Sequence, residues 1–130
     1  MKRLKNAVNR IFKLSEYETV KYEDLQSAPA KIWIDLSTNL EATAESKVKY
    51  MRYPTKKTGQ LVFITEIEKG HGYHYHMHDC KETITVMQGE VVLNDQKSLA
   101  QLSTETLHSG TAHKIIAKVK AQIFVEFIKV

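Results

Sequence analysis

The chain has 130 residues, of which 42% are apolar and 26% charged. This is the size and composition of one globular domain, and it excludes intrinsic disorder, collagen and coiled coil. The formal net charge is +4, and because the basic residues are scattered along the chain, no nucleic-acid partner is expected.

The first 30 residues are predicted to form an N-terminal extension. A short amphipathic helix is expected over residues 1–14, with an apolar face formed by Leu4, Val8, Ile11 and Phe12. Such a face more often packs on its own domain or on a partner subunit than on a membrane surface. Pro29 marks a break, and residues 31–130 are expected to form the single main domain.

The cell compartment is predicted from what the chain lacks. The basic N-terminus is not followed by the apolar core of a signal peptide, and no run approaches the roughly 18–20 apolar residues of a membrane span. The single cysteine, Cys80, cannot form an internal disulfide, which excludes the disulfide-rich secreted class and fits a reducing compartment. A cytoplasmic protein without a membrane partner is therefore expected.

Most of the chain after residue 30 has the pattern of short β-strands. Strands are predicted at 31–36, 47–53, 61–68, 71–78, 83–88, 90–93, 104–107, 113–119 and 121–130. Turns are predicted at 54–59, Gln88-Gly89, 94–96 and Ser109-Gly110, and residues 37–46 are expected to form a loop or a helical turn. Many short strands without intervening helical patterns indicate an all-β, antiparallel sandwich or barrel.

Histidines are concentrated in one predicted strand, since four of the six lie within residues 71–78. Strand side chains alternate between two faces. The expected faces are His74, His76 and His78 on one side, and Tyr73, Tyr75 and Met77 on the other. Two imidazoles at positions i and i+2 of a strand can reach a single metal ion, and imidazole suits Zn, Cu, Fe and Ni.

Two neighbouring strands add polar groups at the ends of apolar rows. Glu82 shares its predicted face with Ile84 and Val86, and His113 shares its face with Ile115. An apolar cavity with a few convergent polar groups is the usual form of a small-molecule site. A buried carboxylate and several buried imidazoles are costly without partners, and one metal ion would satisfy them all.

These residues carry a family resemblance. The pattern Gly70-x5-His76-x-His78-x3-Glu82-x6-Gly89 resembles the first signature of the cupin superfamily, with every fixed position filled. Two histidines and a glutamate in addition to the two glycines make a chance match rare. The resemblance covers about residues 60–130, and the earlier residues match only as extra strands and an N-terminal extension.

The second cupin signature, Gly-x5-Pro-x-Gly-x2-His-x3-Asn, is kept only in part. Gly110 and His113 stand at their positions, whereas Leu102 replaces the leading glycine, His108 the proline and Ala117 the final asparagine. The histidine is retained, but loss of the first glycine and of the proline leaves the conformation of the preceding loop open.

The resemblance implies a small, antiparallel jelly-roll β-barrel. It also implies one divalent metal ion inside it, held by His76, His78, Glu82 and His113, which in this family is Fe, Mn, Ni, Zn or Cu. Glu82 is in addition the candidate catalytic residue, because a carboxylate that leaves the metal can act as an acid or a base. The alternative is a metal-free barrel in which the same histidines are hydrogen-bonded.

Other residues have weaker predicted roles. The candidate substrate-binding residues are His74, Ile84, Val86 and Ile115. For His74, hydrogen bonding outside the ligand set and a place at the barrel mouth are open alternatives. His108 is interpreted as a solvated loop residue and His71 as structural. Cys80 lies between two of the implied ligands and is interpreted as an ordinary turn thiol rather than a reactive or ligating thiolate.

A homodimer is expected from the outward apolar residues. The row of Tyr73, Tyr75 and Met77, supported by Phe124 and Ile128, is more typical of packing on another layer or a second subunit than of a nucleic-acid platform. Pairing of two copies through sheet faces or N-terminal strands would also protect strand edges.

The resemblance implies an enzyme or a binding protein. The first hypothesis is a metal-dependent enzyme acting on a small organic molecule by dioxygenase-like or isomerase or lyase chemistry, with the metal as Lewis acid and template. The alternative is a non-catalytic ligand-binding or sensor module, and a third is a structural jelly roll without metal. The residues leave the substrate, the metal and the presence of catalysis open, because a fold does not determine function.

Overall fold

The computed structural model describes residues 18–27, 31–32, 34–35, 40–41, 47–53 and 55–130. The helix predicted over residues 1–14 lies outside the described residues. The described elements are β1 (Glu18–Val20), α2 (Tyr22–Gln26), β2 (Lys31–Ile32), β3 (Ile34–Asp35), β4 (Leu40–Glu41), β5 (Val48–Tyr53), β6 (Gln60–Ile67), β7 (Gly72–His78), β8 (Lys81–Leu93), β9 (Lys97–Leu99), β10 (Thr104–Leu107) and β11 (His113–Ile128). The all-β prediction is confirmed.

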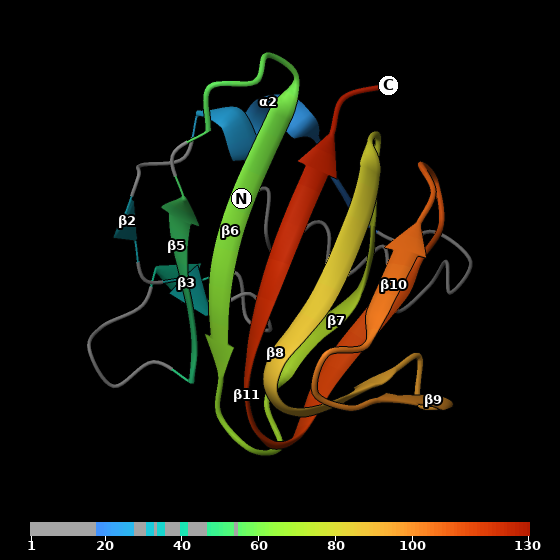
Figure 1. Cartoon of the computed structure of the whole chain (residues 1–130). Helices are drawn as coiled ribbons and strands as arrows, with labels where there is room; N and C mark the ends of the chain where they lie inside the picture. Colours follow the sequence, from blue (N-terminus) through green and yellow to red (C-terminus); the bar gives the residue numbers. More distant parts are fainter. Residues whose placement is uncertain (1–17, 28–30, 33, 36–39, 42–46, 54) are drawn as a thin grey trace.

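One curled sheet forms the body of the molecule (Figure 1). Strand β11 lies at its centre: one edge pairs with β8, and the other pairs first with β7 and then with β6. From there the sheet continues through β5 to β2 on one side and from β7 to β1 on the other, while β8 also pairs with β9 and β10. These pairs are antiparallel except β1–β7. The long strands β8 and β11 pair with each other and therefore connect the strands on the two sides of the curled sheet.

The barrel interior is apolar because alternate residues of each strand point inward. On β11, Ile115 and Ile123 are fully buried, and Ile84 and Val86 are fully buried on β8. Aromatic rings pack edge to face across the strands, with Phe63 in contact with both Tyr50 and Phe127. Burial of this apolar row against the strands on either side is the main stabilising contribution, and it positions the polar groups at the strand ends.

Several predicted strand boundaries are wrong. Residues 83–88 and 90–93 form one strand, β8, and Gln88-Gly89 is not a turn. Gly89 has φ +80°, and a Cβ there would lie 2.2 Å from the carbonyl oxygen of Lys120, so β8 crosses β11 closely where their register shifts. The two strands predicted over 113–130 are likewise one continuous β11. The pair β8–β9 forms a hairpin at the predicted 94–96 turn, although β9 itself was not predicted.

Part of the predicted N-terminal extension contacts the barrel. Strand β1 pairs with β7, and Tyr22 of α2 is 4% exposed and belongs to the core. The boundary between residues 30 and 31 stays a prediction. In the 37–46 stretch, predicted as a loop or helical turn, β4 pairs with β3. Among the described residues, no helix has the length and apolar character to cross a membrane.

Candidate metal centre

Three strands bring the predicted ligands together. His76 and His78 end β7, Glu82 lies at the start of β8 and His113 begins β11. His113 is the register partner of His76, and their ring centroids are 4.3 Å apart. One ring nitrogen from each of the three histidines lies within 4.8 Å of the other two. The three imidazoles are therefore close enough to bind one ion.

A β-bulge in β7 determines which side chains face this cluster. His76 pairs with His113 but Tyr73 pairs with Ile115, so three steps along β7 oppose two steps along β11. The expectation that His74 shares a face with His76 and His78 is wrong, because the extra residue reverses the alternation: His74 is exposed and Tyr73 is buried.

Tyr73 is the residue near the site that the alternating pattern missed. Its ring lies edge-on to His76 with 5.8 Å between centroids, and burial raises the pKa of its phenol well above the ordinary value. The signal that could have found it is Gly72, because a glycine inside a strand often marks a bulge or a close backbone approach. A Cβ at Gly72 would lie 1.8 Å from the carbonyl oxygen of Ile115.

Each imidazole is oriented by a backbone carbonyl at its Nδ1. The Nδ1 of His76 lies 2.8 Å from the carbonyl oxygen of His74, and the Nδ1 of His78 lies 2.8 Å from the carbonyl oxygen of Val20. The Nδ1 of His113 lies 3.3 Å from the carbonyl oxygen of Thr111. A carbonyl oxygen can only accept, so each Nδ1 carries the hydrogen and donates it. The lone pair of the neutral ring is then on Nε2, as in histidines that bind metals through this atom.

Glu82 completes a set of buried lone pairs. Its Oε1 lies 2.9 Å from Nε2 of His113 and 3.4 Å from Nε2 of His78. Within the described part of the chain, these three buried atoms have no partner with hydrogen-bond geometry. With His113 protonated, the 2.9 Å contact is an ion pair with Glu82; with neutral rings, these buried lone pairs face one another without a hydrogen between them, which is costly. The three imidazole nitrogens could hold a divalent transition metal, and Glu82 Oε1 faces two of them, so these residues fit the implied ion.

The protonation states follow from burial and from the neighbouring charges. Burial, with the His113 and His78 rings beside it, lowers the pKa of His76 to about 3, and burial also lowers the pKa of His78. Burial alone would lower the pKa of His113 and raise that of Glu82, but their mutual contact more than offsets it, so the pKa of His113 is raised and that of Glu82 lowered. Glu82 is therefore an anion, the form that binds a metal ion.

The remaining predicted site residues lie in different environments. Ile84, Val86 and Ile115 are fully buried, and their contact with a substrate stays a prediction. His108 is exposed, as expected for a loop residue, and His71 is half-buried. Cys80 is buried, and burial together with the charges of Asp79 and Glu82 raises the pKa of its thiol to about 11. It is therefore a protonated thiol at neutral pH.

Comparison with known proteins shows the fold. No protein-family model and no curated protein matches the chain. Among solved structures, a cupin superfamily protein from Desulfitobacterium hafniense is 16% identical with a TM-score of 0.60, over 79% of this chain and all of that one. KdgF from Halomonas sp. is 15% identical with a TM-score of 0.60, over 68% of this chain and 86% of that one.

A third solved structure has a stated activity. An acetylacetone dioxygenase from Acinetobacter johnsonii is 17% identical with a TM-score of 0.55, and the match covers 62% of this chain and 59% of that one. At such identities the likeness is one of fold. The chain therefore has the cupin jelly-roll fold, as its first signature implied.

Proposed function

We propose that this protein is a metal-dependent enzyme that acts on a small organic molecule. The proposed site holds one divalent metal ion by His76, His78, Glu82 and His113. The observation that supports it best is the buried cluster in which Glu82 Oε1 faces the Nε2 atoms of His78 and His113 without hydrogen-bond geometry. This arrangement suits a cation between the atoms better than it suits a metal-free core.

The chain's own residues have distinct roles in this proposal. Four protein ligands leave one or two coordination positions for a substrate that chelates the ion, and a bound ion supplies a Lewis acid and a template. The carbonyl acceptors hold the imidazoles in place before any ion arrives. If it leaves the ion, Glu82 is also the candidate for proton transfer. The buried Ile84, Val86 and Ile115 would exclude water from the reacting groups.

Among reaction classes, dioxygenase-like oxidation is proposed first, because an acetylacetone dioxygenase has the same fold. Isomerase or lyase chemistry on the same metal is the second class. The metal is Fe, Mn, Ni, Zn or Cu, all of which imidazole and carboxylate groups bind. We also propose that the protein is cytoplasmic and forms a homodimer.

The test is metal analysis followed by a turnover assay. Protein purified without an affinity tag is expected to contain about one transition-metal ion per chain, the capacity of one four-ligand site. Fe(II)-loaded protein is then incubated with acetylacetone, as a probe 1,3-dicarbonyl, and oxygen uptake is measured. Uptake lost in the His76→Ala variant supports a metal enzyme of the dioxygenase class.

Two other results would change the assignment. Full metal occupancy without turnover of 1,3-dicarbonyls, sugars or organic acids would favour the non-catalytic ligand-binding module. Protein that contains no metal and takes up none of the five candidate ions would refute the metal site itself.

A further inference from the structure

One of the three histidines depends on a distant part of the chain. His76 and His113 each donate from Nδ1 to a carbonyl two residues earlier in the chain. His78 instead donates to the carbonyl of Val20, which is 58 residues away in sequence. The orientation of the first two rings is therefore a local property of their own stretch of chain, whereas the orientation of the His78 ring requires the N-terminal segment to be in place.

The segment lies directly beside the metal centre. Strand β1 pairs in parallel with the end of β7, with Glu18 opposite His76 and Val20 opposite His78. Among the described strand pairs of the main sheet, β1–β7 is the parallel pair. Strand β1 has three residues. So short a strand contributes little pairing energy of its own, and other contacts must hold it against β7.

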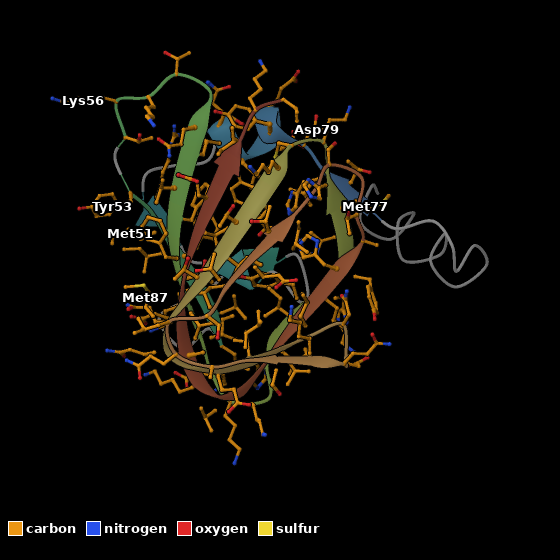
Figure 2. The ribbon with its side chains drawn as sticks, turned by 45° about the vertical axis from the view of Figure 1, so that its right-hand side comes forward. Met51, Tyr53, Lys56, Met77, Asp79 and Met87 are labelled. Atoms are coloured by element: carbon orange, nitrogen blue, oxygen red, sulfur yellow. The ribbon has the colours of Figure 1, made fainter. Side chains whose placement is uncertain are left out.

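Contacts on both sides of α2 supply this attachment. The backbone N–H of Tyr22 donates to Oδ1 of Asp79 over 2.7 Å. Asp79 follows His78 directly in the chain. At the other end, Nη1 of Arg52 donates to the carbonyl of Gln26 over 2.7 Å. Between them the Tyr22 side chain is buried in the core. Figure 2 shows Asp79 at the end of the molecule where α2 lies.

We propose that the segment Glu18–Gln26 is a clasp that positions His78 for metal binding. With the clasp docked, the Val20 carbonyl holds the Nδ1–H of His78 and directs its Nε2 toward Glu82. With the clasp released, His78 loses this acceptor, and the site loses one preoriented ligand. Metal binding and docking of the clasp then strengthen each other by the same factor, because coupling between two sites is reciprocal.

The test separates the clasp from the charge of Asp79. The Asp79→Ala variant removes both the acceptor for Tyr22 N–H and the negative charge near His78. The Asp79→Asn variant removes the charge but keeps an acceptor oxygen. Zn²⁺ affinity is measured by chelator competition for both variants and the wild type, with thermal unfolding as a check on folding. We expect Asp79→Ala to weaken Zn²⁺ binding about tenfold, as for other partners outside a ligand set, and Asp79→Asn to stay near wild type.

Hydrogen exchange gives a second readout that does not depend on activity. Zn²⁺ is expected to slow amide exchange of residues 18–26 by at least about fivefold, the lower end of typical couplings, in the wild type but much less in Asp79→Ala. The Arg52→Ala variant removes the hydrogen bond to Gln26 at the other end of the clasp, and Arg52 is not next to a proposed metal ligand in the chain. This variant is also expected to weaken Zn²⁺ binding.

The outcomes distinguish this inference from the proposed metal site on which it rests. Wild-type protein that binds no metal would overturn both. Wild-type protein that binds Zn²⁺ with equal affinity in Asp79→Ala, or with the same loss in Asp79→Asn as in Asp79→Ala, would overturn the clasp and leave the metal site standing. Exchange of residues 18–26 that is unaffected by Zn²⁺ would also overturn the clasp alone.

Discussion

Two histidines of β7 illustrate how local geometry separates a candidate ligand from its neighbour. His76 is half-buried with its ring against His113, whereas His74 is exposed and contributes its backbone carbonyl to the site. A side-chain substitution at His74 therefore leaves the acceptor for His76 in place. The two residues form a matched pair for testing the ligand assignment.

The His76→Ala variant is expected to lower metal affinity by more than about a hundredfold, because a lost ligand costs more than a lost outer partner. The His74→Ala variant is expected to bind metal as the wild type does. Isothermal titration with Zn²⁺ measures both. Equal losses in the two variants would contradict the bulged geometry, since strict alternation puts both rings on one face.

Cys80 permits a prediction about pH. Its pKa is raised to about 11 from an ordinary value of 9.0, mainly by burial, so folding favours the thiol over the thiolate. The stability that the protonated Cys80 thiol contributes to the folded state is therefore fully present below pH 9. It is lost as the pH rises from 9 toward 11. At pH 8 the thiolate fraction is about a hundredfold lower in the folded than in the unfolded chain.

We accordingly expect iodoacetamide to alkylate Cys80 slowly in the native protein at pH 8 and rapidly in denaturant. Mass spectrometry of timed samples measures the rate. The alkaline loss of unfolding free energy should also be smaller in Cys80→Ala, which removes this group while other residues still titrate. Alkylation of the native protein at the unfolded rate would show that Cys80 is accessible and disprove the burial argument.

At the scale of elements, apolar alternation predicted most strands but not their register. Strand β10 has the predicted bounds, and the implied ligands meet because they lie at strand ends. The bulge that turns Tyr73 inward depends on how β7 pairs with β11, which a local pattern does not contain. The Val20–His78 contact joins residues 58 apart, and β1 is too short to produce a periodic signal.

In the loop before β10, Leu102 stands where the cupin signature has a glycine. Its backbone has φ +71°, in the left-handed region that favours glycine. The N–H of Ser103 donates to the carbonyl of Ala100, closing a turn around it. Left-handed backbone costs a residue with a Cβ about 1–2 kcal/mol. The Leu102 side chain is 73% exposed, so little packing offsets this strain.

The Leu102→Gly variant is therefore expected to stabilise the protein by about 0.5–1 kcal/mol, the relieved strain less the extra freedom of glycine in the unfolded chain. Urea unfolding measures the change. Leu102→Ala serves as control, because it removes the exposed side chain but keeps the Cβ. If Ala stabilised the protein as much as Gly, removal of exposed apolar surface rather than relief of backbone strain would be the cause.

At the scale of the whole molecule, several exposed apolar residues lie on one face of the main sheet. Met51 pairs across the sheet with Ile64, Ile64 with Phe124 and Phe124 with Thr85, so these side chains form one outward row. Met51, Tyr53 and Met87 are 39%, 51% and 40% exposed and lie on the same side of the molecule in Figure 2. Scattered apolar residues need no partner, but a continuous row across a sheet is typical of an interface.

We expect this row, rather than the one predicted from sequence, to form the surface of the proposed dimer. Tyr73 is buried in the core, so the predicted row of Tyr73, Tyr75 and Met77 is interrupted. Phe124 does lie outward on β11, half-buried between its neighbours. A homodimer is therefore expected to form through β5, β6, β11 and β8, on the side of the sheet away from the metal centre's inward-facing ligands.

Light scattering with size-exclusion chromatography is expected to give twice the 14.9 kDa chain mass for the wild type. Met51→Lys places a charge in the row, and because a desolvated unpaired charge is costly at an interface, it should shift the protein to monomer. Met77→Lys, on the opposite side in Figure 2, should remain dimeric. Zn²⁺ binding should survive in the Met51→Lys monomer, since the three histidines that could hold the ion come from one chain. A wild-type monomer would exclude this interface, and dissociation by Met77→Lys alone would instead place the partner against β7.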